Sequence, residues 1–180
     1  MSRKELILLS LALVVGGVIS RLMPHPWNVT PLSALGLFAS AYLGYRYSAV
    51  IVFLTMAVSD LWLGFYHWPI MLSVYVSFMV PVIFGLFMRK RRTAALIMAS
   101  TLGSSFIFFL VTNWAVWQFG TMYPHSLTGL LESYTMAIPF FKNSLLGDIF
   151  YTGLFFGAYE LFRAVSNRWY LSYFAGSKAV

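Results

Sequence analysis

Residues 69–114 decide the fold of this chain, and they read PIMLSVYVSFMVPVIFGLFMRKRRTAALIMASTLGSSFIFFLVTNW. An apolar run over 69–88 is followed by Arg89-Lys90-Arg91-Arg92 and then by a second apolar run over 93–114. A helix needs about 20 residues to cross a hydrocarbon layer about 30 Å thick, and each run has that length. The pattern predicts two antiparallel membrane-spanning helices joined by a basic connection.

The composition of the whole chain agrees with a membrane location. Of its 180 residues, 60% are hydrophobic, 9% are charged and none is cysteine. Soluble domains carry roughly 25% charged residues, and a water-soluble fold of this size cannot hide so much apolar surface. The composition therefore excludes a soluble enzyme, a disordered chain and a disulfide scaffold. We expect one integral membrane domain over residues 1–180.

Four further apolar runs extend this pattern along the chain. The first run ends in Ile19-Ser20-Arg21, which lacks the small-x-small pattern of a signal-peptide cleavage site, so we interpret it as an uncleaved helix. The runs are continuous rather than alternating, which argues against a β-barrel. The prediction is an all-α polytopic membrane protein with six transmembrane helices, at 5–22, 31–45, 48–66, 69–88, 93–114 and 144–165.

The basic residues predict the orientation of these spans. With the N-terminus in the cytoplasm, ten of the twelve Lys and Arg side chains fall on the cytoplasmic side, and only Arg21 and Lys142 fall outside. Six spans then place both termini inside, an N-in/C-in topology. The net charge of +7 is interpreted as orientation in the inner (plasma) membrane of a cell, and no nucleic-acid partner is expected.

Polar and aromatic residues gather at the predicted outer ends of the spans. A carboxylate within a span costs roughly 3 kcal/mol on insertion scales, so Asp60 and Asp148 are candidates for function, with a structural hydrogen-bond network as the alternative. The tryptophans could stack on a flat ligand, although interfacial belts of aromatic residues are common. The predicted substrate-binding residues are His25, Asn28, Asp60, His67, Asn113, Trp114, Trp117 and Asp148.

The longest connection, residues 115–143, also falls on the predicted outer side. Leu127, Leu130, Leu131 and Tyr134 recur in it at helical spacing, which predicts a short amphipathic helix lying on the membrane or over a cavity. Connections of this length are uncommon unless they serve a function. We expect the segment to act as an outer lid.

Small residues recur at four-residue spacing on two helix faces. Such faces let helix backbones approach closely, either within one chain or against a separate membrane partner. The residues predicted to dock a partner are Ala12, Gly16 and Ser20 in the first span and Gly36, Ser40 and Gly44 in the second.

No catalytic or metal site is predicted. The three histidines lie about 40 residues or more apart and match no local metal motif. The nucleotide-binding pattern G-x-x-x-x-G-K-[ST] does not occur, so active transport would need an ion gradient or another subunit. No cofactor is expected.

One block of sequence resembles a known group of proteins. Arg21-Leu-Met-Pro-His-Pro-Trp-Asn-Val-Thr-Pro31, Ser59-Asp60 and Gly147-Asp148 resemble the signature of an uncharacterised family of small bacterial integral-membrane proteins. That family more distantly resembles the S components of energy-coupling-factor (ECF) vitamin transporters. The resemblance implies a six-helix, S-component-like bundle that binds a micronutrient from outside. It also implies docking onto a transmembrane subunit driven by two ATPases.

The resulting hypothesis is a membrane component that captures a small micronutrient for uptake. In some S components a cysteine meets the cobalt of cobalamin, and because this chain has no cysteine that ligation cannot be transferred. The alternatives are a proton-coupled secondary transporter that uses Asp60 and Asp148, an intramembrane enzyme with an outer-face histidine site, and a non-catalytic assembly factor.

Overall fold

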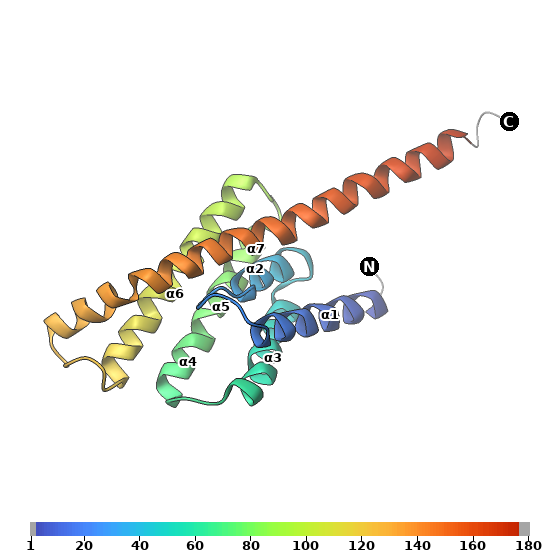
Figure 1. Ribbon diagram of the computed structural model, residues 1–180. Coiled ribbons are helices and arrows are strands. Elements are labelled where there is room, and N and C mark those ends of the chain that lie inside the picture. The colour runs from blue at the N-terminus through green and yellow to red at the C-terminus, as the bar shows by residue number, and fades with distance from the viewer. Residues whose placement is uncertain (1–2, 177–180) are drawn as a thin grey trace.

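The computed structural model describes residues 3–176, and the side chains of residues 3–166. Over this part the chain forms α-helices and no strand (Figure 1). The helices are α1 (Arg3–Leu22), α2 (Leu32–Tyr42), α3 (Tyr45–Leu63), α4 (Trp68–Ser77), α5 (Met79–Phe87), α6 (Ala94–Phe119) and α7 (Leu127–Gly176).

Helix α2 is the centre of the bundle. It has 11 residues, about 16 Å at 1.5 Å per residue, and every residue from Leu32 to Ala41 is buried. The helix follows Pro31, and the chain reverses just after it at Gly44, whose φ of 102° favours glycine. Helices α3, α5, α6 and α7 all pack against it, so this short helix is enclosed by the rest of the chain.

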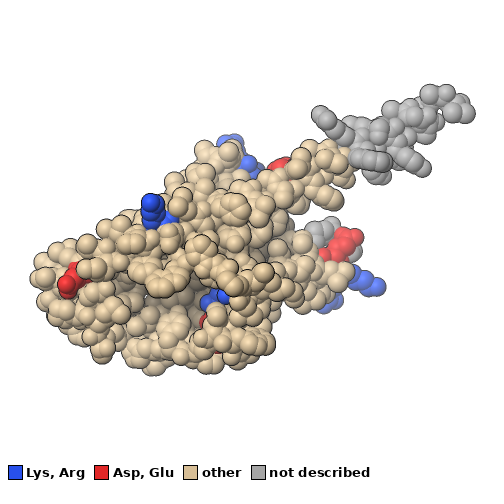
Figure 2. Space-filling view, in the orientation of Figure 1, with Lys and Arg blue, Asp and Glu red and all other residues tan. Residues whose placement is uncertain are grey.

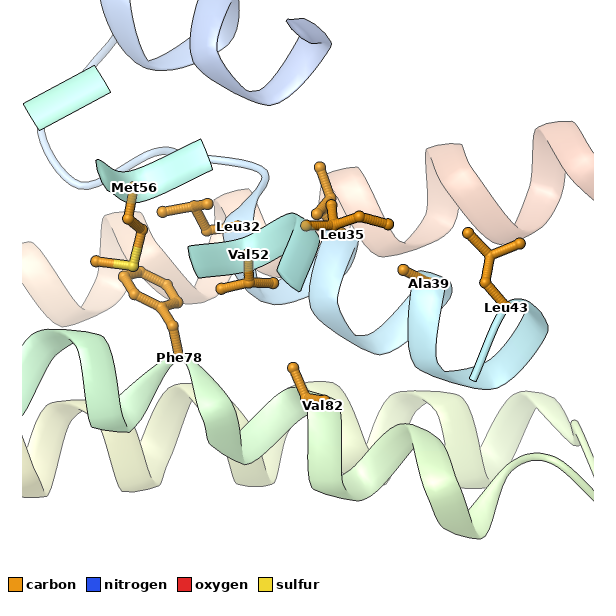
Figure 3. Packing of buried hydrophobic residues seen from close by; sticks show 9 residues of the cluster. Leu32, Leu35, Ala39, Leu43, Val52, Met56, Phe78 and Val82 are labelled. Atoms are coloured by element: carbon orange, nitrogen blue, oxygen red, sulfur yellow. The ribbon is translucent and has the colours of Figure 1, made fainter. Parts of the chain in front are cut away.

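The core forms where α2, α3 and α5 meet. Leu32, Leu35 and Ala39 of α2 pack against Val52 and Met56 of α3 (Figure 3). Phe78, between α4 and α5, and Val82 of α5 complete the cluster. A second cluster on the other side of α2 joins it to α7; it consists of Leu37, Phe38, Ala41, Met88 and Phe156.

Serine hydroxyls add hydrogen bonds between these helices. Ser40 Oγ donates to the Val82 carbonyl oxygen at 2.6 Å, and Ser48 Oγ donates to the Gly36 carbonyl oxygen at 2.6 Å. Gly85 of α5 permits the close approach, because a Cβ there would lie 2.8 Å from a backbone carbonyl oxygen of α2. Small residues and buried hydroxyls thus hold the centre together where lipid supplies no hydrophobic drive between helices.

Helices α4 and α5 form one rod with a break at Phe78. Pro81 explains the position of the break, because proline has no N–H to donate to the carbonyl four residues earlier, and its ring crowds that turn. The rod from Trp68 to Phe87 is still long and apolar enough to cross a membrane.

The structure supports a helical membrane protein and refines the predicted spans. Four helical stretches in the described chain are long and apolar enough to span: Arg3–Leu22, Tyr45–Leu63, Trp68–Phe87 and Ala94–Phe119. Helix α2 is apolar but shorter, and α7 does not meet the same measure of length and hydropathy. The all-helical class is therefore confirmed over the described residues, and four helices have the length and hydropathy of membrane spans. Six spans and their orientation stay predictions.

The predicted lid, 115–143, is not a separate element. Residues 115–119 continue α6, and 127–143 are the first turns of α7, which runs on through Pro139 for 50 residues in all. Helical structure does begin at Leu127, where the short amphipathic helix was predicted, but it is the start of α7, and Leu127 and Leu131 of the predicted apolar face are exposed. The sixth predicted span does not begin at Ser144 as a new helix. Helices α6 and α7 form a long antiparallel pair, and α7 projects beyond the other helices at its C-terminal end (Figure 1).

Charged and aromatic side chains meet at the C-terminal end of α2. Near its last turn, the Arg92 guanidinium lies 4.3 Å from the centroid of the Tyr42 ring, and Tyr42 Oη donates to Glu160 at 3.0 Å. Glu160 also pairs with Arg163 at 3.8 Å. The start of α1 and the end of α7 lie on the same side of the molecule (Figure 1), as the N-in/C-in prediction requires.

The two small-residue faces have different surroundings. Gly36, Ser40 and Gly44 are buried by helices of the same chain, so this face is not available to dock a separate partner. On α1, in contrast, Ala12 and Gly16 are exposed and Ser20 is half-buried. The glycine of α1 that packs inward is Gly17, against Thr55 and Leu35.

Candidate functional site

A cavity of about 230 Å³ lies at the end of the bundle where α2 begins. Its wall comes from α1, the loop 23–31, α2, the loop after α3, α4, α6 and α7; the lining residues are Arg21, Asn28, Thr30, Leu32, Ser33, Tyr66, Val74, Phe78, Phe108, Ser144 and Asp148. Asn28 is exposed, so the cavity reaches the surface. Figure 2 shows a face with few charged side chains, on which basic and acidic atoms lie together at a hollow.

A second cavity of about 120 Å³ adjoins the first. The two share Asn28, Phe108 and Ser144, and the second extends between α6 and α7 to Thr112, Asn113, Ala137, Phe140 and Phe141. The first cavity carries the charged side chains Arg21 and Asp148, whereas the second has four phenylalanine rings together with Thr112 and Asn113. Together the two cavities form a hollow with a charged part and an aromatic part.

The loop 23–31 covers this hollow because α7 gives it a place to pack. A Cβ on Gly147 would lie 3.1 Å from Val29 Cγ1, so a larger residue there would have to push Val29 away by a few tenths of an ångström. Trp27 stacks on Phe140 with ring centroids 5.9 Å apart and planes 3° apart. Asn28, between Trp27 and Val29 in the chain, adopts a left-handed φ of 63°, which asparagine tolerates better than most residues.

Arg21 and Asp60 form an ion pair beside the cavity. Arg21 Nη1 lies 2.9 Å from Asp60 Oδ1, and their side chains are 15% and 4% exposed. Tyr75 Oη donates to Asp60 Oδ2 at 2.7 Å, while Arg21 Nη1 also donates to Ser59 Oγ. Both carboxylate oxygens of Asp60 therefore have partners, which offsets the cost of placing the charge within the bundle.

Asp148 of α7 lines the same cavity as Arg21 and is 6% exposed. Ser105 Oγ donates to Asp148 Oδ2 at 2.6 Å, and Ser33 is a further hydrogen-bond partner. Thr101 and Thr152 continue the polar contacts below it, with their hydroxyl oxygens 3.2 Å apart. Among the residues whose side chains the structure describes, no basic side chain pairs with Asp148.

The structure brings some of the predicted site residues together and leaves others apart. Asn28 and Asp148 line the first cavity, and Asn28 and Asn113 line the second. Asn113 Nδ2 also donates to the Phe109 carbonyl oxygen at 2.8 Å. Asp60 does not line the hollow itself and reaches it only through Arg21.

Besides Asp60, four further predicted residues do not line either cavity. His25 turns back on its own loop, with Nδ1 2.9 Å from the Pro26 carbonyl oxygen, and His67 is exposed at the start of α4. Trp114 contacts Phe119 edge to face, and Trp117 donates its indole N–H to the Pro124 carbonyl oxygen at 3.0 Å. The tryptophans therefore shape the turn between α6 and α7 rather than the wall of the hollow.

Sequence reasoning missed several residues of the wall. Arg21 was counted only as an outer charge, and Ser33, Tyr66 and Ser144 were not selected. A basic residue at the end of an apolar helix, with an aspartate in another span, was the one signal that could have indicated the ion pair. In the described part of the chain, no three His, Asp or Glu side chains lie close enough to hold a metal ion.

Fold and site together define a helical bundle with four helices long and apolar enough to cross a membrane and with a polar hollow at one end. The chain belongs to a family described as "Family of unknown function (DUF6580)", whose model matches residues 1–169. No curated protein and no solved structure matches the chain.

Proposed function

We propose that this protein is a substrate-binding membrane component for the uptake of a small micronutrient, similar in role to the S components of ECF transporters. The observation that carries the proposal is the hollow between Arg21 and Asp148, which reaches the surface beside Asn28. Polar groups that converge on a concave site fix the orientation of a ligand, and the aromatic part supplies apolar contact.

The size of the hollow restricts the ligand. Pockets for drug-sized molecules measure about 300–1,000 Å³, and the two adjoining cavities, of about 230 and 120 Å³, together lie near the lower limit of that range. A compact molecule of one or two rings, or a short chain, fits this space. Cobalamin is far larger, so its binding would require the loop 23–31 to move away.

The chain carries no nucleotide-binding motif of the type noted above, so inward release needs an ion gradient or a partner, and an S-component-like role implies a partner. An apolar groove between α1 and α7 offers a surface for such a partner within the membrane. It measures about 240 Å³ and is lined by Ala12, Leu13, Gly16, Gly17, Ser20, Pro31, Leu35, Tyr151 and Phe155. Its exposed small residues support docking of a transmembrane helix from a transport subunit in the inner membrane.

The proposal is tested by purifying the full chain in mild detergent and identifying retained small molecules by mass spectrometry. A Phe108→Trp variant, which adds volume to the wall shared by both cavities, should lose the retained molecule. A Leu161→Trp variant on the exposed face of α7 serves as the control and should keep it. Absence of any retained molecule, together with unchanged uptake of vitamins in a deletion strain, would contradict the proposal.

A second candidate function is a proton-coupled secondary transporter. It is favoured by one observation, the buried Asp148 carboxylate that lines the cavity with hydroxyl partners. Uptake that is abolished by an uncoupler but survives ATP depletion would favour this function over the first.

A further inference from the structure

Arg21 uses only part of its hydrogen-bonding capacity in the protein. Its contacts with Asp60, Ser59 and the Met56 carbonyl oxygen all involve Nη1. A guanidinium has five N–H donors in a planar fork, of which three belong to Nε and Nη2. In the described part of the chain, neither of these two nitrogens has a hydrogen-bond partner.

The unused edge of Arg21 is accessible. Among the described side chains, the only fully buried polar atom without a hydrogen-bond partner is Ser104 Oγ, so Nε and Nη2 of Arg21 are not sealed inside the protein. Arg21 lines the first cavity, and its Nη1 edge is held by Asp60. The Nε–Nη2 edge is therefore the part of the guanidinium that a ligand in this cavity can contact.

That edge matches one chemical group especially well. Nε–H and Nη2–H are parallel donors, and a planar carboxylate accepts both in a bidentate pair. The ion pair with Asp60 fixes the plane of the guanidinium in advance, so little side-chain freedom is lost when a ligand binds. Thr30 and Ser144 add hydroxyl donors elsewhere in the lining of the cavity.

Asp148, in contrast to Arg21, has acceptor positions that need hydrogen-bond donors or a cation. A carboxylate has about four lone-pair positions, and the two serine hydroxyls satisfy only some of them. A buried carboxylate without a cation is costly in a low-dielectric setting. A ligand that brings an ammonium group or another strong donor would supply the missing partner.

Resting on the proposed function, we infer that the ligand is a small amino-acid-like zwitterion, with its carboxylate on the Nε–Nη2 edge of Arg21 and its ammonium group facing Asp148. Both charged walls belong to the same cavity of about 230 Å³, so one short molecule can contact both. The substrate class is thus a compact amino acid or amino-carboxylate rather than a neutral or purely cationic compound.

The test measures binding of matched probes to the full chain in lipid nanodiscs by isothermal titration calorimetry. The zwitterionic probes are glycine, β-alanine and 4-aminobutanoate, and the single-charge probes are butanoate and butylamine. The variants are Arg21→Lys, which keeps a cation for Asp60 but removes the fork, and Asp148→Asn, which keeps a polar partner for Ser105.

We expect at least one zwitterion to bind about tenfold or more tightly than either single-charge probe, since each charge-assisted contact is worth at least that factor. Arg21→Lys should weaken zwitterion and butanoate binding while leaving butylamine unchanged. Asp148→Asn should weaken zwitterion and butylamine binding while leaving butanoate unchanged.

Two results would overturn the inference, and they are distinguishable. If the purified protein retains a small molecule without an anionic group, or if the variants do not separate the probes, the ligand class is wrong while the proposed function stands. If neither a retained molecule nor any probe binds to the folded protein, the proposed function and the inference both fail.

Discussion

Replacement of Asp60 by Asn tests whether the ion pair beside the cavity holds the site in place. The substitution removes the negative charge 2.9 Å from Arg21 but keeps the shape of the side chain and an acceptor for Tyr75. Breaking a buried pair by removing one partner costs about 3–5 kcal/mol, because the remaining charge is left uncompensated. Arg21 is 15% exposed, so we expect a loss near the lower limit, about 3 kcal/mol.

The assay is reversible unfolding by SDS in mixed micelles, followed by tryptophan fluorescence. Glu160→Gln is the matched control, because it removes one charge from the pair with Arg163, whose side chains are 63% and 53% exposed. An exposed pair contributes about 0–1 kcal/mol, and glutamine still accepts from Tyr42. The two variants make the same chemical change and differ in burial.

A loss below about 1 kcal/mol for Asp60→Asn, equal to that of the control, would refute the reasoning. It would show that water reaches the pair and screens it, as for ordinary surface pairs. Arg21 would then have no fixed orientation, and the accessible Nε–Nη2 edge would lose its structural basis. Normal unfolding of the control and strong destabilisation of Asp60→Asn is the result that the structure predicts.

Three further predictions concern close packing and the loop over the cavity. Gly85→Ala should lower the free energy of unfolding in SDS by about 2–3 kcal/mol, because the added methyl group meets a carbonyl oxygen of α2. In the control Gly153→Ala the methyl group points into open space, so this free energy should stay unchanged or rise by up to about 1 kcal/mol. Gly147→Val should push Val29 away and reduce ligand retention by about tenfold, a loss of about 1.4 kcal/mol, as measured by mass spectrometry; full retention would show that the loop does not cover the site. Asn28→Gly should fold normally, because glycine accepts a φ of 63°, but should retain less ligand; undiminished retention would show that the Asn28 amide serves only the turn.

The helical membrane class could be predicted from the sequence because hydropathy and length are local properties. The runs over 69–88 and 93–114 correspond closely to the α4–α5 rod and to α6. Helix α2 was also located, although its 11 residues are too few to span alone. Its central position could not be predicted, because an apolar helix facing protein and one facing lipid have the same composition.

The long α7 shows where local signals mislead. Pro124 precedes the helix, as expected for a residue that punctuates the chain, but Pro139 lies inside it. The sequence therefore suggested a lid that ended before Ser144, where the structure has one continuous helix. Proline inside a membrane helix is tolerated when neighbouring groups compensate for the missing hydrogen bond, and those neighbours are not visible in the sequence.

The candidate site was predicted in part, for a comparable reason. Asn28 and Asp148 were selected as polar residues at the outer ends of spans, and both line the cavity. His67 and Trp117 have the same sequence-level character but point to other parts of the loops. Polarity and position along a predicted span indicate the end of the molecule that holds the cavity, whereas only packing decides which side chains face the hollow.

Access to the hollow from outside the cell is the most direct test of the central claim. Because the chain has no cysteine, Ser144→Cys introduces a single thiol at a position shared by both cavities. Intact cells are treated with a small, membrane-impermeant methanethiosulfonate, and the purified protein is then examined for modification and for retained ligand. We predict that the thiol is modified without permeabilisation and that modification abolishes ligand retention. Modification only after permeabilisation, or full retention by the modified protein, would contradict an outward-facing binding site.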